Sequence, residues 1–156
     1  MIPIFLLALS LVLPMVSTSG STSASPRIQF LGAEDIPNTI GCVGFPPGTS
    51  DMQTLFAWGQ FVLVVKVDGR VERLDLEKTS ESHAQKGSWR RGDRIRQEFS
   101  SGRISAVIDL TLTIDCREEE GCKTGITYDG DLTIQLAGTT QEKVEKTIRI
   151  QVYCGC

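Results

Sequence analysis

The chain has 156 residues, and its formal net charge of -3 at pH 7 goes with a sequence pI near 5.2. An acidic chain lacks the basic face that nucleic-acid binding usually needs, so we expect no nucleic-acid partner. The length favours a single domain with its own hydrophobic core.

The first informative segment is Ile2–Val16, which is almost wholly apolar and carries no charged side chain. About 15 apolar residues are fewer than the roughly 20 that a membrane span needs, and they are typical of a secretory signal peptide. No Lys or Arg precedes Arg27, so an uncleaved short anchor stays as an alternative. We predict a signal peptide over 1–19, a flexible Ser/Thr-rich segment over 20–26 and one disulfide-tied β-domain over 27–156. The mature chain should be extracellular or periplasmic, without stable membrane insertion.

The N-terminal part of the mature chain gives weak structural signals. Arg27–Leu31 is a candidate first strand. Gly32–Ser50 contains three prolines and four glycines, which predicts a long irregular segment. Asp51–Trp58 is ambiguous, because Asp51 could cap a short helix or the segment could lead directly into a strand.

From Phe61 onward the pattern predicts β-structure. Phe61–Val67 is rich in β-branched residues and apolar on both faces. Asp68–Gly69 predicts a tight turn, after which Val71–Leu76 forms the returning strand. Glu77–Gly92 is then expected to be a polar loop, and Arg94–Phe99 alternates as a further strand.

The C-terminal half shows the clearest alternation. One face of the strand over 104–115 is expected to be buried; it comprises Ile104, Ala106, Ile108, Leu110, Leu112 and Ile114. We predict a hairpin of Cys122–Tyr128 and Leu132–Leu136 about Asp129–Gly130, with a three-residue loop that keeps the apolar positions in phase. Val144–Cys154 gives the last alternating strand.

About seven short strands with closely spaced turns indicate an antiparallel sandwich or barrel. Of the two we predict an all-β antiparallel β-sandwich, Ig-like or similar, whose C-terminal half is an up-and-down meander.

Five cysteines are present, and an odd number in an exported chain leaves at least one unpaired within the chain. Cys116 and Cys122 flank one short loop, so we predict that they are bonded. Cys42 is then the partner of either Cys154 or Cys156, and alternation does not choose between them. The cysteine left over near the C-terminus predicts a disulfide-linked homodimer or a small-thiol adduct.

Two other readings of the cysteines remain open. Cys116, Cys122, Cys154 and Cys156 would supply the four thiolates of a structural zinc site, but their spacings match no usual motif. Cys154-Gly155-Cys156 could also handle copper or redox chemistry. We expect no metal and no cofactor.

A basic cluster predicts a patch for an anion or an acidic partner, or simply a solvated strand face. Its members are Lys86, Trp89, Arg90, Arg91, Arg94, Arg96 and Arg103. Arg91-Gly92-Asp93 matches the adhesive tripeptide of many integrin ligands, although Gly92-Asp93 also suits a turn before a strand.

Neither calcium binding nor catalysis has strong support. The acidic residues that invite a calcium site are expected at opposite ends of the meander; they are Asp115, Glu118, Glu119, Glu120, Asp129 and Asp131. His83 is the only histidine, and no Gly-x-Ser-x-Gly elbow or His-Glu-x-x-His helix accompanies it. We therefore name no catalytic residue.

The sequence favours a secreted, non-enzymatic interaction or structural module that acts through its surface on a protein or glycan ligand. The alternatives are a small exported hydrolase-like enzyme using His83 and a metal- or redox-handling protein using the C-terminal Cys-Gly-Cys.

Overall fold

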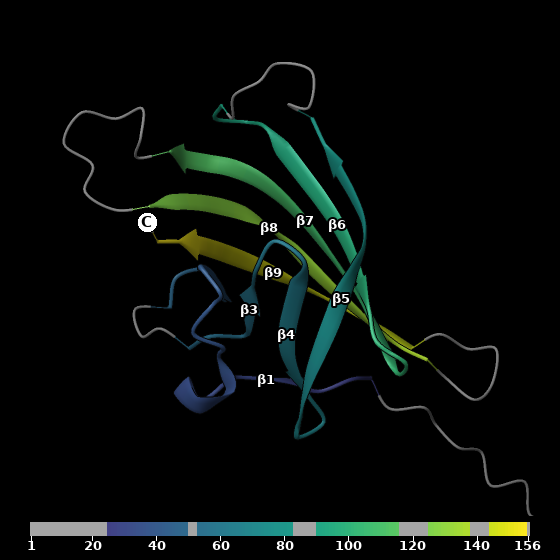
Figure 1. The fold of residues 1–156 in the computed structure, drawn as a ribbon. Helices are drawn as coiled ribbons and strands as arrows, with labels where there is room; N and C mark the ends of the chain where they lie inside the picture. The colour runs from purple at the N-terminus through teal and green to yellow at the C-terminus, as the bar shows by residue number, and fades with distance from the viewer. Residues whose placement is uncertain (1–24, 50–52, 83–89, 116–124, 138–143, 156) are drawn as a thin grey trace, which may run out of the picture.

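The computed structural model describes residues 25–49, 53–82, 90–115, 125–137 and 144–155. Within these residues, nine strands form one antiparallel sheet that curls until β4 also pairs with β5, which closes an eight-stranded barrel with β1 added beside β4 (Figure 1). The strands are β1 (Ile28–Gln29), β2 (Cys42–Phe45), β3 (Phe56–Trp58), β4 (Val62–Val67), β5 (Arg70–Glu81), β6 (Arg94–Ser100), β7 (Ile104–Asp115), β8 (Ile126–Leu136) and β9 (Val144–Cys154).

The sandwich prediction is therefore wrong, and the fold is a barrel. Alternation of apolar and polar residues is the same in both architectures, because each buries one face of every strand. What distinguishes them is which distant strands pair. Here β2 pairs with β9, and β4 pairs with β5, so the sheet returns on itself instead of splitting into two layers.

The barrel interior is filled by apolar side chains, as an eight-stranded barrel allows. The largest fully buried ones are Phe56, Phe99, Leu63, Leu74, Ile104, Ile108, Leu110, Leu112, Leu132, Ile134, Ile150 and Val65. They come from β3 to β9, so a single core joins all of these strands.

The turn predicted at Asp68–Gly69 is confirmed. Val67 pairs with Arg70, which leaves a two-residue loop between β4 and β5. Asp68 has φ 51° and Gly69 has φ 81°, and positive φ at both central residues is the geometry that favours Asp-Gly.

The predicted hairpin about Asp129–Gly130 is wrong, because β8 runs unbroken through both residues. Gly130 pairs with Leu110 on β7 and Ile150 on β9. A Cβ added at this glycine would overlap the carbonyl oxygen of Asp109. The glycine thus permits close approach of two strand backbones, which is another common reason for glycine inside a strand.

Other elements differ from the expectation in extent. The segment predicted as irregular contains β2 and a short 3-10 helix, η1 (Ala33–Asp35). Of the ambiguous segment Asp51–Trp58, the residues Phe56–Trp58 form β3, and β5 extends to Glu81 into the expected polar loop. A bulge between Leu112 and Ile114 shifts the phase of β7, so Ile114 is 41% exposed although it was expected to be buried.

The N-terminal segment covers the outer face of β3 and β4. Leu31 packs there with Ala57 and Val64 in a second small apolar cluster. An ion pair between Asp35 and Lys66, with 3.3 Å between the carboxylate oxygen and Nζ, also links this segment to β4.

A disulfide joins Cys42 on β2 to Cys154 on β9. The two residues are direct partners in the β2–β9 ladder. The structure thus selects Cys154 from the two partners that the sequence left open for Cys42.

Candidate functional site

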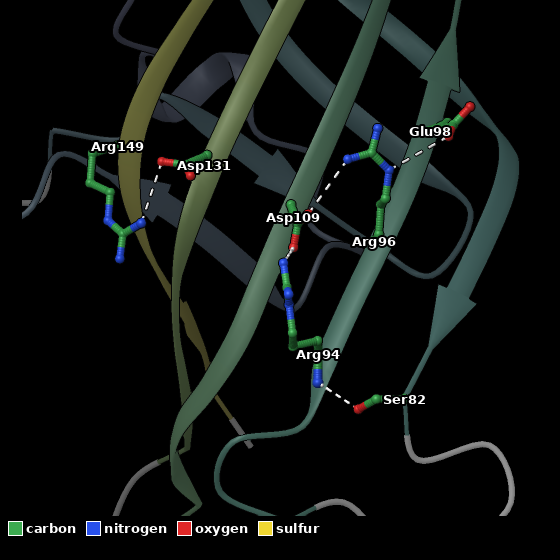
Figure 2. A network of polar contacts seen from close by, with 7 residues as sticks. All are labelled: Ser82, Arg94, Arg96, Glu98, Asp109, Asp131 and Arg149. Carbon is green, nitrogen blue, oxygen red and sulfur yellow. Dashed lines mark hydrogen bonds and ion pairs between the residues drawn. The ribbon is translucent and has the colours of Figure 1, made fainter.

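Outward-facing side chains of β6 to β9 form an ordered grid of polar groups. The register places Arg96 opposite Asp109, Asp109 opposite Asp131, and Asp131 opposite Arg149. These four residues make one row across the sheet, seen in Figure 2 with the residues that contact them. Their neighbours along each strand point into the core, because side chains alternate between the two faces.

Asp109 is the centre of this row. It receives Arg94 at 3.0 Å on one carboxylate oxygen and Arg96 at 3.5 Å on the other. Arg96 also lies 3.7 Å from Glu98 on its own strand. The backbone N–H of Arg94 donates to Ser82 Oγ at 2.8 Å, which attaches the end of β5 to the same network (Figure 2).

Two carboxylates face each other in the middle of the row. Like charges directly opposite on neighbouring strands are destabilising, so the adjacent residues Asp109 and Asp131 need compensation. Arg149 supplies it on the β9 side, 3.5 Å from Asp131, while the arginines of β6 supply it for Asp109. The row therefore has two adjacent carboxylates at its centre with an arginine on each outer side, and these arginines hold the carboxylates in place.

The next two rows carry neutral and acidic groups. Thr133 and Thr147 share a hydrogen bond of 2.9 Å between their hydroxyls. The side-chain amide of Gln135 donates to Glu145 at 2.8 Å, and its carbonyl oxygen accepts from Ser105 at 3.5 Å. These cross-strand bonds fix the side chains on rigid strands, which positions groups more accurately than loops do.

Two hollows lie on this face and meet at Arg96 and Asp109. The first, of about 300 Å³, is lined by Arg96, Val107, Asp109, Asp131, Thr133, Gln135, Glu145 and Thr147. The second, of about 240 Å³, is lined by Ser80, Glu81, Ser82, Arg94, Arg96 and Asp109. We name the two together the β5–β9 groove. Its described lining residues include four carboxylates and two arginines, so the formal charge of these residues is negative.

The structure places only part of the predicted basic patch in this groove. Arg94 and Arg96 line it, and both already contact Asp109. Arg90 and Arg91 are exposed at the turn before β6. Lys86 and Trp89 lie outside the described residues, so an anion-binding role for the whole patch stays a prediction.

The Arg91-Gly92-Asp93 tripeptide lies in a turn that uses its carboxylate locally. Asp93 accepts a hydrogen bond from the backbone N–H of Arg90 at 2.7 Å, and its own N–H donates to the Arg90 carbonyl. Gly92 has φ 91°, a conformation that glycine adopts without strain. These contacts give the tripeptide a turn-forming role.

Several predicted site residues lie outside the described residues. They are His83, Cys116, Glu118, Glu119, Glu120, Cys122 and Cys156, so the Cys116–Cys122 bond and a linked dimer stay predictions. Cys154 is bonded to Cys42 and is therefore not a free thiolate for zinc. In the described part of the chain, no group of three or more His, Cys, Asp or Glu is arranged to hold a metal ion.

Most of the groove residues were not identified from the sequence, although the alternating pattern of the strands places them on the polar face. The residues missed as binding groups include Asp109 and, on β8 and β9, Thr133, Gln135, Glu145 and Thr147. Each occupies the polar phase of an alternating strand, next to apolar positions that were recognised as core. Reading the polar phase of β8 and β9 as one surface would have found them, but only after the register was known.

Among the residues that the structure describes, no helix is long and apolar enough to cross a membrane. Comparisons of the chain with models of protein families, with curated proteins and with solved structures find no match. Any functional conclusion therefore depends on the geometry of the chain itself.

Proposed function

We propose that this chain is a secreted, non-enzymatic interaction module that binds an extracellular partner through the β5–β9 groove. The observation that carries the proposal is the groove itself: two adjoining hollows, lined by polar side chains that cross-strand contacts hold in position. Recognition sites commonly combine such concavity with a few well-placed polar groups.

The filled barrel core supports action through the surface. Small barrels either fill their interior with side chains or leave room for one small ligand. Here large apolar residues of β3 to β9 are fully buried against one another. The polar groups available for recognition are accordingly concentrated on the outer face of the strands.

Export is supported by the sequence and by the disulfide. The apolar segment Ile2–Val16 followed by small residues is typical of a signal peptide. Disulfides such as Cys42–Cys154 form and persist mainly in oxidising compartments. Both observations favour a location outside the reducing cytosol.

The experiment is retention of purified, labelled protein on the surface or secreted matrix of the cells that produce it. Thr133→Arg places a long side chain in the larger hollow and should abolish retention. Arg73→Ala, at an exposed position on β5 outside both hollows, is the matched control and should be retained like wild type. His83→Ala should also be retained, because the module needs no general base.

Circular dichroism and thermal unfolding verify that Thr133→Arg remains folded. Retention of a folded Thr133→Arg variant at the wild-type level would overturn the groove as the binding surface. Loss of retention in a folded His83→Ala variant would show that binding depends on His83 and would count against the groove as the sole binding surface.

A further inference from the structure

We infer that the partner of the β5–β9 groove is a neutral, extended oligosaccharide; this inference rests on the function proposed above. The chemical class follows from the length of the groove, its mixture of donors and acceptors, and its charge.

The groove is long compared with its volume. Its lining residues come from β5, β6, β7, β8 and β9, and neighbouring strands are about 4.8 Å apart. Five strands therefore span about 19 Å across the sheet. A shallow site that extends over five strands suits an extended chain of several sugar rings better than one compact small molecule.

The lining offers donors and acceptors suited to hydroxyl groups. Arg96 has five N–H donors. Two of its nitrogens contact carboxylates, those of Glu98 and Asp109. Asp131 and Glu145 each have two oxygens, and the Thr133 and Thr147 hydroxyls can both donate and accept. A sugar hydroxyl is likewise a donor and an acceptor, so it can join such a network at many points without displacing a whole ion pair.

The charge of the groove disfavours two classes of partner. Its described lining residues carry four carboxylates against two arginines, and with Arg149 beside Asp131 the net charge is still negative, which disfavours sulfated glycans, phosphates and other polyanions. A cationic peptide would have to compete with the arginines that already pair with Asp109 and Asp131. A neutral polyhydroxyl chain meets neither obstacle.

Among the residues that the structure describes, no aromatic side chain lines the two hollows. Recognition by these lining residues therefore rests on hydrogen bonds. A single hydrogen bond contributes only about 1–3 kcal/mol net, so binding must accumulate over several sugar rings. We expect monosaccharides to bind below detection and affinity to rise by about tenfold or more between a disaccharide and a tetrasaccharide.

The test is calorimetric titration of the folded full-length protein with neutral oligosaccharides of increasing length. The panel comprises β-1,4-glucan, α-1,4-glucan, xylan, mannan and chitin oligomers, with a heparin-derived oligosaccharide and oligolysine as charged comparators. At least one neutral series should bind in a length-dependent manner. Its affinity should be the same at low and high salt, because screening does not affect a neutral ligand.

Asp131→Ala and Glu145→Ala should each weaken binding of that series by about tenfold. Asp75→Ala removes an exposed carboxylate of β5 that lines neither hollow and should leave it unchanged. Salt-dependent binding of oligolysine alone, or preference for the heparin fragment, would overturn the inference. So would the failure of every neutral series while Thr133→Arg still abolishes cell-surface retention, a result that would leave the module intact and exclude only its glycan partner.

Discussion

At the scale of single residues, the buried polar side chain of Gln97 is hydrogen-bonded inside the barrel. Gln97 is 6% exposed, and its Oε1 accepts a hydrogen bond of 2.8 Å from the indole N–H of Trp58. Its amide nitrogen donates to Thr79 at 3.4 Å. Trp58 also lies edge-on to Tyr128, with 5.9 Å between ring centroids. The amide thus satisfies a buried indole that would otherwise lack an acceptor.

We predict that Gln97→Leu lowers the free energy of unfolding by about 1–3 kcal/mol, because it leaves the Trp58 N–H buried without a partner. Adding Trp58→Phe removes the stranded donor, so the double variant should lose less than the sum of the two single variants. Urea denaturation of all four proteins measures this cycle. Strict additivity would show that the hydrogen bond contributes nothing specific.

Asp35 gives a second prediction at this scale, because its pKa is below the usual value of 3.8. The main cause is the hydrogen bond from the backbone N–H of Gly32, and Lys66 lowers the pKa further although partial burial raises it. A carboxyl group with a lowered folded-state pKa stabilises the fold above its unfolded-state pKa. That contribution disappears as the pH falls through the folded-state value.

Asp35→Asn should therefore unfold more easily than wild type near neutral pH, and the difference should shrink as the pH falls below about 3.8, the unfolded-state value. Lys66→Met removes only the ion pair and should reproduce part of the effect. Denaturant titrations at several pH values provide the measurement. A difference that stayed constant from neutral to strongly acidic pH would contradict the electrostatic explanation.

At the scale of elements, the sequence located most strands of the C-terminal half but misjudged β8. Val144–Cys154 was predicted with the bounds that β9 has, and the turn between β4 and β5 was also correct. Asp129–Gly130 has the same local signal as Asp68–Gly69 and is nevertheless in mid-strand. A dipeptide that favours a turn was overridden because β7 and β9 offer partners along the whole length of β8.

Gly130→Ala should destabilise the protein strongly, by more than the roughly 1 kcal/mol typical of point variants. The added methyl group would overlap the backbone carbonyl of Asp109, which cannot move without disturbing the β7–β8 ladder. Gly102→Ala is the matched control, since a Cβ there meets open space. Thermal unfolding should show a lower melting temperature for Gly130→Ala than for Gly102→Ala. Equal melting temperatures would mean that β8 is not closely packed at Gly130.

At the scale of the whole molecule, the disulfide links β2 to β9, where the N-terminal strands pair with the meander of β5 to β9. Cys42 and Cys154 are 112 residues apart in sequence, yet adjacent in the β2–β9 ladder. A bond that closes so long a loop removes much of the conformational freedom of the unfolded chain. The closure of the barrel at β2–β9 should therefore depend on it.

We predict that the double variant Cys42→Ser/Cys154→Ser loses about 2–5 kcal/mol of stability. Wild-type protein unfolded in the presence of reductant should approach the stability of this variant. Cys156→Ser, which leaves the Cys42–Cys154 bond in place, serves as the control. Equal denaturation midpoints for the double variant and wild type would show that the pairing of β2 with β9 is stable without the disulfide.

Local sequence pattern determined which residues lie on the two faces of most strands, because side-chain alternation is a property of each strand by itself. It also determined the Asp68–Gly69 turn, whose backbone conformation depends on two adjacent residues. The acidic net charge follows from composition, and the apolar N-terminal segment follows from the order of residues.

Only the tertiary structure decided that the sheet closes as a barrel, that β8 is one strand and that Cys42 pairs with Cys154. It also decided which polar residues share the β5–β9 groove. Thr133, Gln135, Glu145 and Thr147 are adjacent because of the register between β8 and β9. Register and closure depend on contacts between residues far apart in the chain, and no local pattern contains that information.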